Sequence, residues 1–136
     1  EASILMNIQE MGTAAQYRLP VKVFILNNKY MGMVRQWQEL LHGGRYSESY
    51  SDALPDFVKL AQSWHWAGLR AETPDELDGV IKEMVANGKP TLVDVVVDPA
   101  ENCFPMIPSG AAHYDMLLGP NDRAGKPISE EGMVLV

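Results

Sequence analysis

Several residue types are scarce in this sequence, and each scarcity excludes a class of protein. Cys103 is the only cysteine among 136 residues, which excludes an internal disulfide framework and a cysteine metal cluster and favours a reducing, cytoplasmic setting. Lysine and arginine number 11 against 18 acidic residues, and the formal net charge is −7. Nucleic acids and anionic membrane surfaces bind clustered positive charge, so neither is expected as a partner. Apolar runs are far shorter than the ~20 residues that a membrane span needs.

What is present is the composition of an ordinary globular domain. Hydrophobic residues make up 46% and charged residues 21% of the chain, so it can bury a core and is not expected to be disordered. Its length suits about one domain. The sequence opens Glu1-Ala2-Ser3, with no initiator methionine and no signal-peptide pattern. We therefore expect a fragment that begins inside a domain.

The apolar pattern switches several times between helical and strand spacing. Helices are predicted over 3–17, with Ser3 as a cap, over 32–41, over 55–63, and from a capping box at 73–76 to about 86. Strands are predicted over 21–26, 67–71 and 91–97. This alternation indicates an α/β fold of three layers, an open parallel sheet with helices on both faces.

The C-terminal part of the sequence has a different character. Residues 1–97 carry the α/β pattern, whereas residues 98–136 contain five prolines and little periodicity. Loops of that length are usually functional lids or flexible tails. We expect 1–97 to be part of one domain and 98–136 to be a C-terminal tail.

Polar residues follow the first predicted strand, at the sheet edge where open α/β sheets bind ligands. Asn27 and Asn28 offer amide oxygens that suit Mg²⁺, Glu1 adds a carboxylate, and Gly32 opens a helix whose N–H groups can approach an anion. Together these features suit a metal–diphosphate site, although an Asn-Asn pair after a strand is more often a simple turn. The apolar residues of the next helix are, by pattern alone, most simply interpreted as core: Met33, Val34 and Trp37.

A longer set of residues resembles a known enzyme family. Glu1-Ala2-Ser3 followed by Asn27-Asn28 is similar to the second half of the thiamine diphosphate motif, which begins Gly-Asp-Gly or Gly-Asp-Ala and ends Asn-Asn. The string Gly32-Met33-Val34-Arg35-Gln36-Trp37 is more specific and resembles acetohydroxyacid synthase (acetolactate synthase). The resemblance extends from Glu1 to about Leu118, and its other matching segments are 6–11, 19–23, 25–28, 55–61 and 104–111.

The resemblance implies an enzyme that condenses two 2-keto acids, pyruvate with pyruvate or 2-ketobutyrate, with loss of CO₂ in branched-chain amino-acid biosynthesis. It implies thiamine diphosphate as the cofactor that carries the carbanion chemistry, Mg²⁺ to hold its diphosphate, and FAD in the intact flavoprotein. It also implies a homo-oligomer, a dimer or tetramer, and a regulatory small subunit as a further partner. The glutamate that activates the cofactor lies in an N-terminal domain that this sequence lacks. We therefore expect no catalytic residue here, and no activity from these 136 residues alone.

The same resemblance assigns roles to individual residues. Metal binding is implied for Glu1, where the family has Asp, for Asn28, and for Tyr30 through its backbone carbonyl. Contact with the substrate is implied for Met33, Val34, Trp37 and Ser109, the last of these in a C-terminal lid over the active site. His42, His65 and His113 match no catalytic role. Contact with the cofactor is implied for Ala2, Ser3, Met6, Asn28, Tyr30, Met31, Gly32 and Met33.

Two other functions stay open at this point. One is another thiamine diphosphate-dependent lyase, such as a keto-acid decarboxylase, although the Gly-Met-Val-x-Gln-Trp string and the Pro-Ser-Gly of the lid speak against it. The other is a non-catalytic α/β binding module that keeps the fold and not the chemistry. The replacement of Asp by Glu1 keeps this second alternative open.

Overall fold

The structure, a computed structural model, describes residues 1–123. The chain divides into two compact units. The sheet unit comprises Glu1–Tyr30 and Ser51–Pro99, and the α3 unit comprises Met31–Tyr50 and the chain from Ala100 onward. The elements in chain order are α1 (Ala2–Leu5), α2 (Glu10–Gln16), β1 (Lys22–Asn27), α3 (Gly32–Leu40), α4 (Phe57–Ser63), β2 (Ala67–Ala71), α5 (Pro74–Ala86), β3 (Thr91–Val96), and the 3₁₀ turns η1 (His113–Asp115) and η2 (Pro120–Arg123).

The sheet unit is built on three parallel strands in the order β1-β3-β2. Thr91 at the start of β3 pairs with Lys22 of β1 on one side and with Ala67 of β2 on the other. Parallel neighbours need a crossover connection, and α5 supplies the one between β2 and β3. The parallel α/β sheet predicted from the sequence is confirmed.

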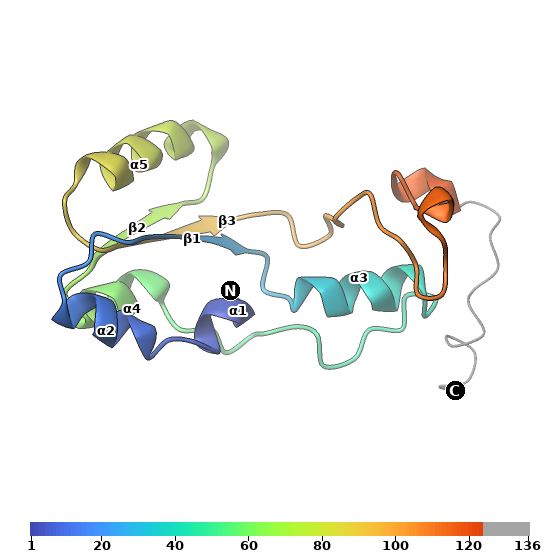
Figure 1. The fold of residues 1–136 in the computed structure, drawn as a ribbon, viewed down its shortest axis with the longest axis horizontal. Coiled ribbons are helices and arrows are strands. Elements are labelled where there is room, and N and C mark those ends of the chain that lie inside the picture. The colour runs from blue at the N-terminus through green and yellow to red at the C-terminus, as the bar shows by residue number, and fades with distance from the viewer. Residues whose placement is uncertain (124–136) are drawn as a thin grey trace. The chain divides into compact units, whose positions relative to one another are not determined.

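Alternate residues of β3 face the two sides of the sheet, as the period of a strand requires. Leu92 belongs to a buried cluster with residues of β1, α2 and α4, including Ile25, Met11 and Phe57. Val93 and Val95 belong to a second cluster, against which the apolar residues of α5 pack. Figure 1 shows α5 on one face of the sheet and α2 and α4 on the other. The expected helix–sheet–helix layering is therefore confirmed.

The first helix differs from its prediction. A single helix over 3–17 is wrong, because residues 6–9 form a turn between α1 and α2. In this turn Glu10 N donates to Asn7 O, and Met11 N to Ile8 O, both at 3.1 Å, so bonds to the third preceding residue replace the α-helical pattern. Ser3 lies inside α1 and does not cap it, since the N-cap is Glu1 and no side chain caps this end.

The two later helix starts show how local side-chain bonds decide a boundary. The helix predicted over 55–63 begins two residues later, at Phe57. Asp56 is its N-cap, and the Asp56 Oδ1 accepts a hydrogen bond from Lys59 N at 3.1 Å. At α5 the predicted capping box is present, and Glu76 Oε2 accepts from Thr73 N at 3.0 Å. Side-chain acceptors of this kind satisfy amides that the first helical turn leaves without partners.

In the α3 unit, the described part of the predicted tail packs against the helix. Met106 and Leu117 form an antiparallel bridge, and both are buried with Leu40 and Leu41 from the end of α3. Residues 124–136 of that tail lie outside the described residues. Within residues 1–123, no helix has the length and apolar character to cross a bilayer.

Candidate cofactor and substrate sites

The chain leaves β1 through two successive side-chain turns. Asn27 is buried at the end of the strand, and its Oδ1 accepts from Lys29 N at 3.2 Å. Asn28 Oδ1 accepts from Tyr30 N at 3.1 Å. Lys29 between them has a φ of 62°, the left-handed region that non-glycine residues rarely adopt. Asn-based turns stabilise such a conformation locally, so these bonds fix the backbone where a ligand of an open parallel sheet would bind.

Glu1 lies against this turn. Both of its carboxylate oxygens are buried, and among the described residues neither makes a hydrogen bond of ordinary length and angle, although the backbone N–H groups of Asn28 and Lys29 point toward them. Burial raises the pKa of the Glu1 carboxyl, while the backbone N–H groups of Asn28 and Lys29 act in the opposite direction. The charge of Asp94 adds to the upward shift. A buried carboxylate whose hydrogen bonds are incomplete is costly, and a cation beside it would lower that cost.

The residues around this carboxylate fit a hard cation. The Glu1 carboxylate, the Asn28 side-chain oxygen and the Tyr30 carbonyl are oxygen donors of the kind that Mg²⁺ prefers, and Asn28 and Lys29 adjoin Glu1 through their backbone N–H groups. In the part of the chain that the structure describes, no three His, Cys, Asp or Glu side chains gather into a metal site. A site here therefore depends on amide and carbonyl oxygens as well as on Glu1. A hollow of about 460 Å³ adjoins this place and is lined by Glu1, Ser3, Ile4, Asn7 and residues 23–26 of β1.

A second candidate site lies wholly within the α3 unit. It is a cavity of about 620 Å³ beside α3. Trp37 is 42% exposed and Met33 56% exposed, so the interpretation of these residues as core is wrong. Ser109, which the sequence also assigned to the substrate, is exposed and is not among the residues that line this cavity. The lining residues are Met33, Val34, Trp37, Gln38, His42, Arg45 and Ser47.

The structure thus distributes the expected site residues over both units. Glu1, Ala2, Ser3, Asn28 and Tyr30 belong to the sheet unit, together with Met6, which is exposed. Met31, Gly32 and Met33 open α3, and Met31 N donates to Ser49 O at 2.8 Å. The expected site residues therefore form two local groups, one at the end of β1 and the other on one face of α3.

Sequence reasoning missed one residue of the first set, Asp94 of β3. It is only 1% exposed, and its Oδ1 accepts from Asn27 Nδ2 at 2.9 Å. Its Oδ2 pairs with Arg70 Nη1 at 3.3 Å. A single carboxylate inside the apolar run 92–97 was the available signal, because charged residues are rarely buried without partners. Asp94 connects all three strands and, through Asn27 at the end of β1, supports the turn that carries Asn28.

These features define a class of protein, an α/β domain with an open parallel sheet, and in this class ligands bind beyond the carboxyl ends of the strands. Residues 1–95 match the family model described as thiamine pyrophosphate enzyme, C-terminal TPP binding domain, and the chain belongs to this family.

The names of the curated relatives are more specific than the description of the family model. An acetolactate synthase large subunit of Haemophilus influenzae is 45% identical over 119 residues, which cover 87% of this chain and 21% of the relative. The acetolactate synthase isozyme 3 large subunit of Escherichia coli is 44% identical over 126 residues, 90% of this chain and 22% of the relative. The chain therefore spans about a fifth of the length of these relatives.

Among solved structures, a thiamine diphosphate-dependent 4-hydroxybenzoylformate decarboxylase of Rhodococcus jostii RHA1 is similar over 72% of this chain and 18% of its own. The TM-score is 0.66 at 30% sequence identity. The fold is therefore shared with an enzyme that is named for a different reaction from that of the synthases.

Proposed function

We propose that this chain is the C-terminal part of an acetolactate synthase and binds the diphosphate of thiamine diphosphate through Mg²⁺. The observation that carries the proposal is the Glu1 carboxylate, whose two oxygens are buried beside the Asn28 turn and make no hydrogen bond of ordinary geometry among the described residues. The high identity to acetolactate synthase large subunits over 87–90% of the chain supports the choice of reaction.

In this proposal Glu1, Asn28 and the Tyr30 carbonyl would hold the metal, which would in turn hold the diphosphate of the cofactor. Ala2, Ser3, Met6, Met31, Gly32 and Met33 contact the cofactor, which when bound supplies the carbanion chemistry of the reaction. The residues of this chain bind the cofactor and orient it. The Asn27 amide, held by Asp94, keeps the turn in the conformation that offers the Asn28 and Tyr30 oxygens.

The cavity beside α3 is proposed to select the second keto acid. Met33, Val34 and Trp37 give it a broad apolar wall, and Arg45 and His42 add polar groups to the lining. An apolar wall rewards one additional methylene by about 1–3 kcal/mol. This is enough for a moderate preference of 2-ketobutyrate over pyruvate. Ser109 contributes through the proposed C-terminal lid, since it does not line the cavity itself.

The complete enzyme needs more than this chain contains. We propose a cytoplasmic homo-oligomer, a dimer or tetramer, that carries FAD and binds a regulatory small subunit. The cofactor-activating glutamate lies in an N-terminal domain outside this sequence. On this proposal the 136 residues alone form no acetolactate.

The test is a product assay on the complete protein with pyruvate, thiamine diphosphate, Mg²⁺ and FAD. Acetolactate as the product is expected. The likeness to the decarboxylase structure favours a second candidate, simple decarboxylation of a 2-keto acid. Release of the corresponding aldehyde without a condensation product would establish that alternative and overturn the synthase. Absence of both products, with no Mg²⁺-dependent binding of thiamine diphosphate, would leave a non-catalytic binding module.

A further inference from the structure

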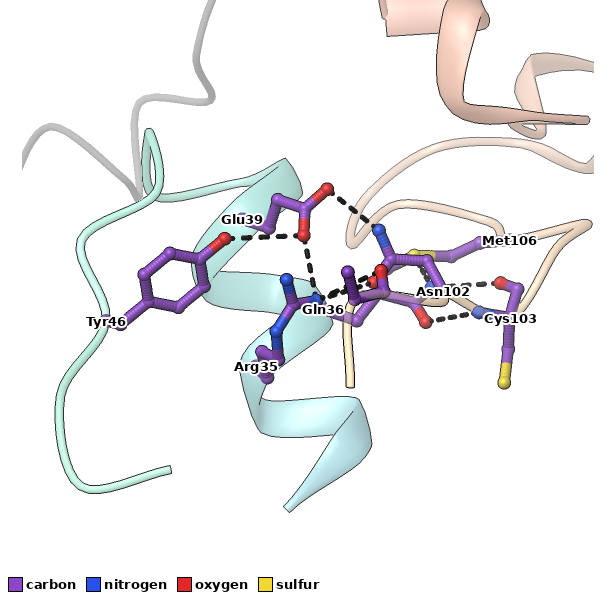
Figure 2. A network of polar contacts seen from close by, with 8 residues as sticks. Arg35, Gln36, Glu39, Tyr46, Asn102, Cys103 and Met106 are labelled. Carbon is purple, nitrogen blue, oxygen red and sulfur yellow. Dashed lines mark hydrogen bonds and ion pairs between the residues drawn. The ribbon is translucent and has the colours of Figure 1, made fainter. Parts of the chain in front are cut away.

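A buried glutamine joins α3 to the segment that follows residue 100. Gln36 is only 2% exposed, and both ends of its amide are used. Its Oε1 accepts from Cys103 N at 2.7 Å, and its Nε2 donates to Cys103 O at 2.9 Å. The same Nε2 lies 2.9 Å from Met106 Sδ. Figure 2 shows the side chain of Gln36 reaching from the helix to this segment.

The bonds to Cys103 have a specific geometry. Cys103 donates its N–H and accepts through its own C=O, as a residue does in a hydrogen-bonded pair of antiparallel strands. Here a side-chain amide takes the place of the second strand. Because both backbone groups are engaged by one rigid carboxamide, this contact fixes the orientation of the segment as well as its distance from α3.

A second set of contacts surrounds this bond on the more exposed side. Glu39 accepts from Asn102 Nδ2 at 2.9 Å and pairs with Arg35 Nη1 at 2.9 Å. Tyr46 OH donates to Glu39 at 3.3 Å, and the guanidinium of Arg35 lies 5.3 Å from the centre of the Tyr46 ring. Figure 2 shows these side chains converging on Glu39 and Asn102. The Arg35–Glu39 pair is partly exposed, whereas Gln36 is buried and binds both backbone groups of Cys103, so the Gln36 bonds are the more specific constraint.

The position of Gln36 on the helix connects this constraint with the cavity. Residues three or four apart share a face of a helix. Gln36 is three residues from Met33 and adjacent to Trp37: Met33 and Trp37 line the cavity, whereas the neighbouring Gln36 is buried and bonded to Cys103. The bonds of Gln36 therefore set the rotation of α3 about its axis, and with it the face that forms the cavity wall.

We propose that Gln36 is a positioning residue for the α3 cavity: by binding the backbone of Cys103, it fixes the rotation at which Trp37 and Met33 line the cavity. The identity of the substrate as a keto acid rests on the proposed function, whereas the structural link between Gln36 and the segment 102–106 does not.

The experiment compares two variants in the complete protein. Gln36→Met keeps the length of the side chain and removes both polar atoms. Gln36→Glu keeps the acceptor for Cys103 N and removes the donor to Cys103 O. Amide hydrogen exchange is measured for the segment 100–118 together with the product ratio from a pyruvate and 2-ketobutyrate mixture. Gln62→Met is the matched control, because Gln62 is exposed on α4.

In Gln36→Met we expect exchange of the Cys103 amide to accelerate about tenfold or more, the effect of losing one ordinary hydrogen bond. In Gln36→Glu we expect the Cys103 amide to keep part of its protection. The product ratio should change about threefold or more in Gln36→Met, a fraction of what a methylene in an apolar pocket decides. Gln62→Met should change neither quantity.

The outcomes test the structural link, the positioning role and the proposed function separately. Unchanged exchange at Cys103 in Gln36→Met would overturn the link itself. Faster exchange with an unchanged product ratio and unchanged KM would show a bond that only stabilises the segment, and would overturn the positioning role. If Gln36→Met does not fold, equal product ratios in Gln36→Glu, which lacks the donor to Cys103 O, and in the control overturn the proposal. A complete protein that makes no acetolactate would refute the proposed function. The exchange measurement would still test the contact between Gln36 and the segment 102–106.

Discussion

The Asn27 side chain donates a hydrogen bond of 2.9 Å to Asp94 Oδ1 and joins the neighbouring parallel strands β1 and β3. Both residues are buried. The other oxygen of Asp94 pairs with Arg70 on β2 at 3.3 Å, so the carboxylate connects all three strands. A buried carboxylate is tolerated only while its oxygens have donors. The bond therefore supports the sheet as well as the turn that follows Asn27.

Replacement of Asn27 by alanine should weaken the sheet by about 1–3 kcal/mol, because it leaves Asp94 Oδ1 buried without its donor. Hydrogen exchange of the β3 amides in the complete protein measures this opening free energy. Asn7→Ala is the control, since Asn7 is exposed. Equal exchange of β3 in the two variants would contradict the structural role assigned to Asn27.

Two glycines of the sheet unit should respond to alanine in opposite directions. A Cβ on Gly68 of β2 would lie 2.6 Å from the backbone oxygen of Val58, whereas a Cβ on Gly79 of α5 would meet nothing within 4 Å. Gly68→Ala should therefore destabilise the unit by about 1–3 kcal/mol through overpacking of α4 against β2. Gly79→Ala should stabilise α5 by about 0.5–1 kcal/mol. Hydrogen exchange of α4 and α5 amides distinguishes them, and a stabilising Gly68→Ala would refute the close packing.

The start of α5 should respond to acid through Glu76. Its carboxylate accepts from Glu72 N at 2.8 Å and from Thr73 N at 3.0 Å, and these bonds hold its pKa below the ordinary value of 4.5. A lowered pKa means that the stabilisation is present above the ordinary value and is lost as the pH falls through the lowered one. The amide shifts of Glu72 and Thr73, followed by NMR during acidification, should report this loss. Glu76→Gln should abolish the titration, and Glu83→Gln, at an exposed position of the same helix, should leave it intact.

This capping box also shows which features a sequence can predict. Thr73, Pro74 and Glu76 act on backbone groups within a few residues, so their pattern predicted the start of α5 correctly. The three strands were likewise predicted to within a residue or two, because alternation and β-branched residues are local signals. The parallel sheet followed from the order of the elements.

Features that depend on distant contacts were not predictable in the same way. The helical spacing over 3–17 continues through residues 6–9, yet the chain turns there, and Gly12 on the far side of the turn packs so closely against Trp64 that a Cβ would lie 2.9 Å from its ring. The association of Gln36 with Cys103 spans 67 residues, and no periodicity marks it. The grouping of residues 31–50 with the chain from Ala100 onward has the same origin. In each case tertiary packing overrides the local pattern.

The candidate metal site gives a prediction for Glu1. Glu1→Gln should weaken Mg²⁺-dependent binding of thiamine diphosphate about tenfold or more, because a neutral amide replaces the only carboxylate among the proposed ligands. Glu1→Asp should retain binding, since the shorter side chain keeps the charge. Calorimetric titration of the complete protein with the cofactor, over a series of Mg²⁺ concentrations, measures the effect. Glu10→Gln on α2 is the control at an exposed carboxylate, and equal affinities for both glutamine variants would exclude Glu1 from the site.

Trp37 should govern the choice of the second keto acid. Its indole is 42% exposed and forms part of the apolar wall of the α3 cavity. Trp37→Leu removes much of the surface that would contact the additional methylene of 2-ketobutyrate. Since such a contact is worth about 1–3 kcal/mol, the preference over pyruvate should fall by roughly tenfold.

The measurement is the ratio of the two condensation products formed by the complete protein from an equimolar mixture of the keto acids. Trp64→Leu is the matched control, because Trp64 lies in the sheet unit against Gly12 and does not line the α3 cavity. A ratio that falls in Trp37→Leu and not in Trp64→Leu would assign the selection to the α3 cavity. An unchanged ratio in both would place the selecting surface elsewhere in the enzyme, and the cavity would then have to serve another step.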